Sequence, residues 1–206
     1  NFLAGLTEGG PVTPALQARA SLLAAQIAFL GPLLGSLSRP IGGALADRLG
    51  GGRITLYTFV AMIFSAGILV ATGTIDDASP GAATGTMMTA YVVGFIALFV
   101  LSGLGNGSVY KMIPAIFAAK AAAMTEATAE ERAAWSRTMS GALIGIAGAI
   151  GALGGVGINL VLRAAYTGAD KSATSAFWVF LGFYVACAAV TRGVYLRRSD
   201  RAAVTV

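Results

Sequence analysis

Two basic side chains that interrupt long apolar segments are the residues of this chain most suited to chemistry. Arg39 and Lys111 each lie inside such a segment, whereas none of the nine Asp and Glu residues does. A cation at membrane depth costs about 2.5–3.5 kcal/mol on insertion scales, so it is normally paired or faces a water-filled cavity. We therefore expect a small anion from outside the chain to pair with these two cations.

The composition indicates an integral membrane protein that spans a lipid bilayer. Of 206 residues, 56% are hydrophobic and 11% charged, and the mean hydropathy is +0.77, whereas soluble domains are about 25% charged. The net charge of +5 does not indicate nucleic-acid binding, because the basic residues are spread over loops. With no histidine and a single cysteine, Cys187, we expect no metal site, no cofactor and no enzymatic activity.

Five segments are long and apolar enough to cross a bilayer as helices. A span needs about 20 apolar residues, and continuous apolar runs without alternation exclude a barrel. The sequence predicts an all-α integral membrane fold, with residues 1–20 as an outer loop and the end of a preceding helix, 21–198 as a helix bundle and 199–206 as a tail. The predicted spans are about 22–46, 54–73, 87–119, 138–162 and 175–196.

The distribution of basic residues predicts the orientation. One side's connections hold Arg19, Arg163 and Lys171. The other side's hold nine basic residues: Arg48, Arg53, Lys120, Arg132, Arg137, Arg192, Arg197, Arg198 and Arg201. Cytoplasmic loops carry an excess of Lys and Arg, so the side with nine basic residues is expected to be cytoplasmic. We therefore expect a multi-pass protein of the cytoplasmic membrane with its C-terminus in the cytoplasm. An outer N-terminus without methionine or signal peptide suggests that earlier helices precede this chain.

The two buried cations are expected near the middle of the membrane. Arg39 precedes Asp47, at the cytoplasmic end of its helix, by eight residues or about 12 Å. Lys111 precedes Lys120 by nine residues, or about 13–14 Å. Transporter substrate sites commonly lie at this depth, and a planar guanidinium suits a small oxyanion. Alternatively, the long aliphatic side chain of Lys111 carries its ammonium group to the membrane interface. Arg39 could instead donate to backbone carbonyls that lose their helical partner because of Pro40.

The segment around Lys111 combines polar side chains with glycines. Such a combination suits either a polar cavity or close helix packing, and the buried amide of Asn106 is the hardest to explain by packing. We predict a substrate-binding set of Arg39, Asn106, Ser108, Tyr110 and Lys111, with Gly103, Gly105 and Gly107 removing bulk beside it.

The fourth predicted helix has one face of nearly bare backbone. Its glycines recur at spacings of three and four, and the run that ends in Asn159 includes Gly148, Gly151, Gly154 and Gly155. Packing explains such a stripe well, and we interpret most of these glycines in that way. A helix face without side chains would also permit another helix to slide over it. For Asn159 we favour a functional role.

Specific strings carry a family resemblance. Gly43-Ala-Leu-Ala-Asp47-Arg48-Leu-Gly50-Gly-Gly-Arg53 resembles the signature loop of the major facilitator superfamily. In that loop we expect Asp47 to cap the next helix and to face a basic residue. Three further strings, at 29–43, 103–114 and 148–159, together resemble the nitrate/nitrite porter family, with likeness from about residue 20 to 198.

The resemblance implies a twelve-helix carrier of which this chain looks like helices eight to twelve, with the N-terminal half as its missing partner. It implies transport of nitrate or nitrite by alternating access. Arg39 would be the C-terminal member of an arginine pair that clamps the anion, Asn106 and Tyr110 would lie near the substrate, and the glycines of 148–159 would give mobility. The polar string at 106–114 favours nitrate uptake with protons over strict nitrate/nitrite exchange.

Two alternatives remain open at this point. The first is a facilitator for another small anion. The second is a non-transporting membrane subunit in which Arg39 and Lys111 pair with acids on a partner chain. Any proton coupling would use the missing half or the substrate, because these helices hold no histidine or carboxylate inside a span.

Overall fold

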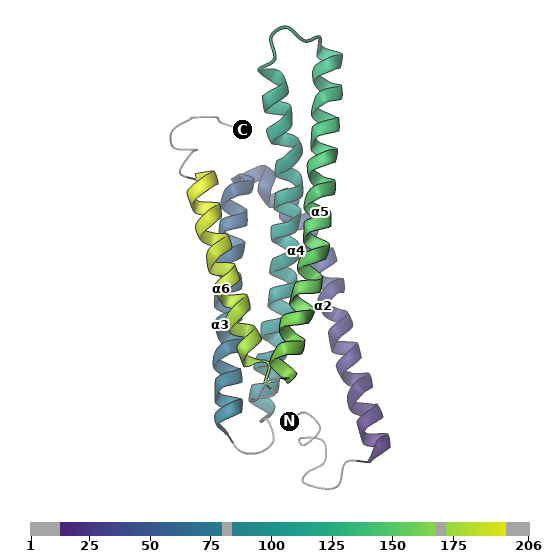
Figure 1. The fold of residues 1–206 in the computed structure, drawn as a ribbon, viewed down its shortest axis with the longest axis vertical. Coiled ribbons are helices and arrows are strands. Elements are labelled where there is room, and N and C mark those ends of the chain that lie inside the picture. The colour runs from purple at the N-terminus through teal and green to yellow at the C-terminus, as the bar shows by residue number, and fades with distance from the viewer. Residues whose placement is uncertain (1–12, 80–83, 168–171, 197–206) are drawn as a thin grey trace.

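The computed structural model describes residues 13–79, 84–167 and 172–196, which form an elongated bundle of long helices (Figure 1). Five of its helices are long and apolar enough to cross a membrane, which confirms the predicted all-α membrane fold. The elements are α2 (Pro14–Leu49), α3 (Gly51–Ala78), α4 (Gly85–Ala122), α5 (Ala129–Thr167), α6 (Thr174–Thr191) and a short π-helical turn, η1 (Arg192–Leu196).

Helices α2 to α5 extend beyond their predicted ends, whereas α6 ends at Thr191 and the predicted span to residue 196 is completed by η1. The prediction of a loop up to residue 20 is wrong from Pro14 onward, because α2 begins there. Proline suits a first helical position, where its fixed φ is preorganised and its missing N–H is not needed. The remainder of that predicted loop and most of the predicted tail lie outside the described residues.

A capping box explains why α5 begins well before the predicted residue 138. The Thr128 backbone N–H donates to Glu131 Oε2 at 2.8 Å, and the Glu131 N–H donates to Thr128 Oγ1 at 3.2 Å. This reciprocal pair satisfies two donors that a helix start otherwise leaves free. The resulting α4–α5 hairpin projects beyond the other helices at the end of the bundle where the α2–α3 turn also lies (Figure 1), which we call the turn end.

Helix α4 is the central element, because it packs against α2, α3 and α5, while α3 also packs against α6. The buried apolar cluster lies between α3, α4 and α6 and consists of Met62, Leu69, Val70, Leu98 and Phe177. Phe177 also makes an edge contact with Phe95, with ring centroids 5.7 Å apart. The core is therefore on the α3 side of α4, whereas α2 and α5 cover its other sides.

The α2–α4 crossing is a contact of backbone against backbone, and we call it the α2–α4 seam. A Cβ atom at Gly103 would collide with the carbonyl of Gly35, and one at Gly107 would collide with the carbonyl of Arg39. The Ser38 hydroxyl donates to the Val100 carbonyl across the seam at 2.9 Å. Small residues allow this approach, so the packing interpretation of Gly103 and Gly107 is the one that the structure shows.

In contrast to the seam, most of the glycine face of α5 has no neighbouring helix packed against it among the described residues. A Cβ at Gly151, Gly154 or Gly155 would meet nothing within 4 Å among the described residues. No residue in the most apolar part of α5 is buried. The packing role that we expected for these glycines is therefore not fulfilled within the described part of the chain.

The turn between α2 and α3 depends on Gly50, whose φ of 87° is in the left-handed region. A residue with a Cβ would be strained there. Its N–H donates to the Ala46 carbonyl at 3.0 Å and closes the last turn of α2. This sharp reversal places the end of α2 and the start of α3 beside the last third of α4, where Gly51 approaches Met112.

Candidate anion site

Arg39 lies in the C-terminal third of α2, on the α2–α4 seam. Its carbonyl is pressed against Gly107, which fixes the level of its backbone relative to α4. Its side chain is exposed, and no carboxylate in the described residues forms an ion pair with it. Among the described residues, Arg39 is therefore a cation without a counter-charge, on a helix long and apolar enough to span a membrane.

Lys111, in contrast, has a partner within the chain. Its Nζ lies 3.3 Å from Asp47 Oδ2, and the two side chains are 58% and 53% exposed. The expectation that no carboxylate of this chain reaches Lys111 is therefore wrong. The lysine stem carries the ammonium group to the end of α2, as in the alternative interpretation of this residue.

The same ion pair corrects the prediction for the signature loop. Asp47 does not cap α3, because the cap position is Gly50 and no side chain bonds there. It does face a basic residue, which is Lys111 on α4 rather than a neighbour in the loop. Arg48 and Arg53 are exposed on either side of the turn.

Ser108 is a structural contact rather than an accessible ligand group. It is fully buried, donates to the Gly51 carbonyl at 3.0 Å and shares a hydrogen bond with Thr55 Oγ1 at 3.2 Å. These bonds join α4 to the first turn of α3. The prediction that Ser108 contacts a substrate is not supported by this structure, because its hydroxyl is enclosed and already bonded.

The side chains of Asn106 and Tyr110 remain available to bind a solute. Neither side chain makes a hydrogen bond within the described residues, and Tyr110 is 36% exposed. The Tyr110 hydroxyl lies 3.9 Å from the position that a Cβ of Gly148 would occupy, so it lies beside the glycine face of α5. Asn159 is exposed, and its amide donates to the Gly155 carbonyl one turn earlier at 2.9 Å.

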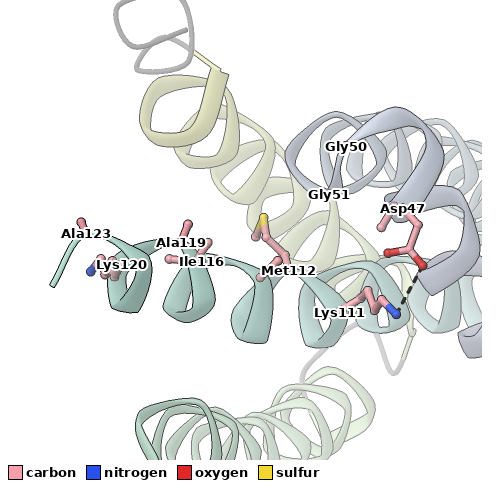
Figure 2. Close-up of a pocket in the computed structure, with 11 residues that line it drawn as sticks. Asp47, Gly50, Gly51, Lys111, Met112, Ile116, Ala119, Lys120 and Ala123 are labelled. Atoms are coloured by element: carbon pink, nitrogen blue, oxygen red, sulfur yellow. Dashed lines mark ion pairs between the residues drawn. The ribbon is translucent and has the colours of Figure 1, made fainter. Parts of the chain in front are cut away.

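A cavity of about 560 Å³ lies at the turn end, between the end of α2, the α2–α3 turn and α4 (Figure 2). Its charged lining residues are Asp47, Lys111 and Lys120. Figure 2 shows the Asp47–Lys111 pair at one end of the cavity and Lys120 toward the other. Arg39 does not line it. This cavity was not predictable from the sequence, because the contact between Asp47 and Lys111 depends on the α2–α4 crossing.

Within the described residues, no three histidine, cysteine or carboxylate side chains gather in a way that would hold a metal ion. The polar groups present are the guanidinium of Arg39, the ammonium groups of Lys111 and Lys120, the Asn106 amide and the Tyr110 hydroxyl. Such groups bind an anion by charge and hydrogen bonding.

The five long apolar helices define a multi-pass α-helical membrane protein. The chain is 35% identical over 188 residues to the nitrate/nitrite transporter NarU of Salmonella typhimurium, a match that covers 85% of this chain and 37% of that protein. Against NarU of Escherichia coli the identity is 35% over 182 residues, or 84% and 36% of the two chains. A probable nitrate/nitrite antiporter NarK2 of Thermus thermophilus is 39% identical over 90 residues, or 44% and 19%.

No family model matches the chain. Over most of its own length the chain is similar to nitrate/nitrite transporters. These relatives are transporters and not enzymes, in agreement with our expectation. The chain spans somewhat more than a third of the length of the NarU proteins that it matches.

Proposed function

We propose that this chain takes part in secondary active transport of nitrate, nitrite or both, as the C-terminal half of an alternating-access carrier. The observation that carries the proposal is Arg39, a cation on an apolar helix without an ion-pair partner among the described residues. Relatives with transporter names support it. The partners are the anion, an N-terminal half, the lipid bilayer and, as a candidate co-substrate, protons.

In this mechanism the anion lies against Arg39, whose two parallel N–H donors match two oxygens of a planar oxyanion. Asn106 and Tyr110 supply further hydrogen-bonding groups without losing an internal partner. The glycine face of α5, including Gly148, Gly151, Gly154 and Gly155, is the surface along which the other half slides. Asn159 belongs to that face, where its amide donates to the Gly155 carbonyl.

We also propose that the turn end faces the cytoplasm in the cytoplasmic membrane. The α2–α3 and α4–α5 connections lie at that end. The helix ends that flank them hold four exposed or half-exposed basic residues, Arg48, Arg53, Arg132 and Arg137. Basic residues are retained on the cytoplasmic side during insertion.

The experiment is nitrate uptake by proteoliposomes that contain the complete carrier with Arg39→Lys. The lysine ammonium group is a point charge and cannot replace the two parallel N–H donors of the guanidinium. We therefore expect uptake to fall by at least about tenfold, the effect of roughly 1.4 kcal/mol of lost transition-state binding. Arg163→Lys, the same change at an exposed position outside the site, is the matched control. Near-normal uptake by Arg39→Lys, with the protein folded, would reject the role of Arg39.

A carrier of another small anion is the second candidate, because the fork of Arg39 fits any planar or carboxylate-like oxyanion. Competition for labelled nitrate by nitrite, chlorate and small carboxylates separates the two. Strong inhibition by a carboxylate, with weak inhibition by nitrite, would transfer the assignment to that class of substrate.

A further inference from the structure

We propose that the cavity at the turn end is a second, shallow site for the transported oxyanion, in which Asp47 and the anion compete for Lys111. This inference rests on the function proposed above. It adds a binding position separate from Arg39 and gives Asp47 the role of an internal competitor.

The charges of the cavity favour an anion. Two lysines, Lys111 and Lys120, and one carboxylate, Asp47, line it, which leaves a net charge of +1 from 2 − 1, and the other lining residues are neutral. Those neutral residues are glycine, alanine, methionine and isoleucine, so the walls have low polarity and concentrate the field of the lysines in the cavity. Its volume of about 560 Å³ is ample for a small hydrated oxyanion.

The Asp47–Lys111 pair is of a kind that exchanges readily. The two atoms are 3.3 Å apart, but both side chains are more than half exposed. Ion pairs with this exposure hold their partners only weakly, because water and salt compete for each charge. The lysine stem has several rotatable bonds, so the ammonium group can leave Asp47 for an oxyanion in the same cavity.

The cavity and Arg39 lie at two levels of the same pair of helices, α2 and α4. Arg39, Gly43 and Asp47 follow one another at four-residue spacing on one face of α2, a rise of about 12 Å from first to last. On α4, Gly107 touches Arg39, and Lys111 is the next residue on that face. Between the two levels the helices are in backbone contact, with the Gly107 carbonyl 3.7 Å from the position of a Gly43 Cβ. The cavity site and Arg39 are therefore two separate positions along the same pair of helices.

The test isolates the shallow site in the complete carrier by removing the deep cation with Arg39→Gln. Sodium nitrate is titrated against sodium gluconate at constant ionic strength, with the carrier in lipid nanodiscs, and binding is followed by line broadening of ¹⁵N-nitrate. We expect Arg39→Gln to retain weak, saturable binding. Adding Asp47→Asn should tighten it by about two- to fivefold, the range for an exposed ion pair, and adding Lys111→Gln should abolish it.

Two further variants keep the test independent of folding. Arg39→Gln with Lys111→Arg preserves the charge and should preserve binding. Arg39→Gln with Arg163→Gln loses a cation that does not line the cavity and should bind as Arg39→Gln alone does. Equal binding with and without Lys111, or no gain from Asp47→Asn in a folded carrier, would overturn the inference. If the Lys111-dependent binding appears but the wild-type carrier takes up no nitrate, the proposed function fails and the shallow site stands.

Discussion

The α2–α4 seam and the glycine face of α5 are both rich in glycine, but the glycines have different surroundings in the two regions. In the seam, Gly103 and Gly107 have another helix's backbone where a Cβ would be, whereas Gly151 and Gly154 face open space. Glycine costs helix stability relative to alanine, so each stripe needs a compensating benefit. In the seam that benefit is close packing, which is visible in this chain. On α5 it must come from a surface that the described residues do not supply.

The largest effect that we expect comes from filling the seam. Gly107→Val introduces a branched side chain against the carbonyl of Arg39, and overpacking of this kind costs about 1–3 kcal/mol. The melting temperature of the complete carrier should fall, and nitrate uptake should fall with it because Arg39 is displaced. An unchanged melting temperature would show that α2 and α4 are not in contact at this level.

The next effect concerns the bond between α4 and the start of α3. Ser108→Ala removes the donor to the Gly51 carbonyl and leaves Thr55 without its buried partner. The unfolding free energy should fall by about 1–3 kcal/mol, while the affinity for nitrate stays near that of the wild type. A large loss of nitrate affinity with unchanged stability would instead support the prediction that Ser108 contacts the substrate. Ser36→Ala, on the exposed side of α2, is the control.

A smaller effect is expected at the start of α5. Thr128→Ala removes the capping box with Glu131, and loss of such a cap costs about 0.5–2 kcal/mol. Hydrogen exchange should show faster opening of the first turn of α5, with transport little changed. Thr138→Ala, within the same helix, should leave that turn protected.

The smallest effect on stability, and the most informative contrast with the seam, is expected for Gly151→Ala. The added methyl meets nothing within 4 Å among the described residues, and alanine favours the helix by up to about 1 kcal/mol. The melting temperature should not fall. If the other half slides over this face, uptake should nevertheless slow, and equal rates for wild type and variant would argue against such sliding.

The fold was predictable from the sequence to a large extent, because apolar runs of bilayer length and glycine spacing are local signals. The helix ends were less predictable: the capping box of Thr128 and Glu131 is a local pattern that hydropathy alone does not reveal. The partner of Lys111 could not be predicted, since Asp47 is distant along the chain and reaches it only through the α2–α4 crossing. The same holds for the burial of Ser108 against Thr55. Arg39 could be selected as a candidate from the sequence, because its signal, a cation in an apolar run, requires no tertiary contact.

The most direct test of the central claim is a structure of the complete carrier in lipid with nitrate bound. The account predicts a planar anion within hydrogen-bonding distance of the Arg39 guanidinium, with Asn106 or Tyr110 beside it. A carboxylate of the protein paired with Arg39 in that position, or a guanidinium directed at the lipid headgroups, would contradict it.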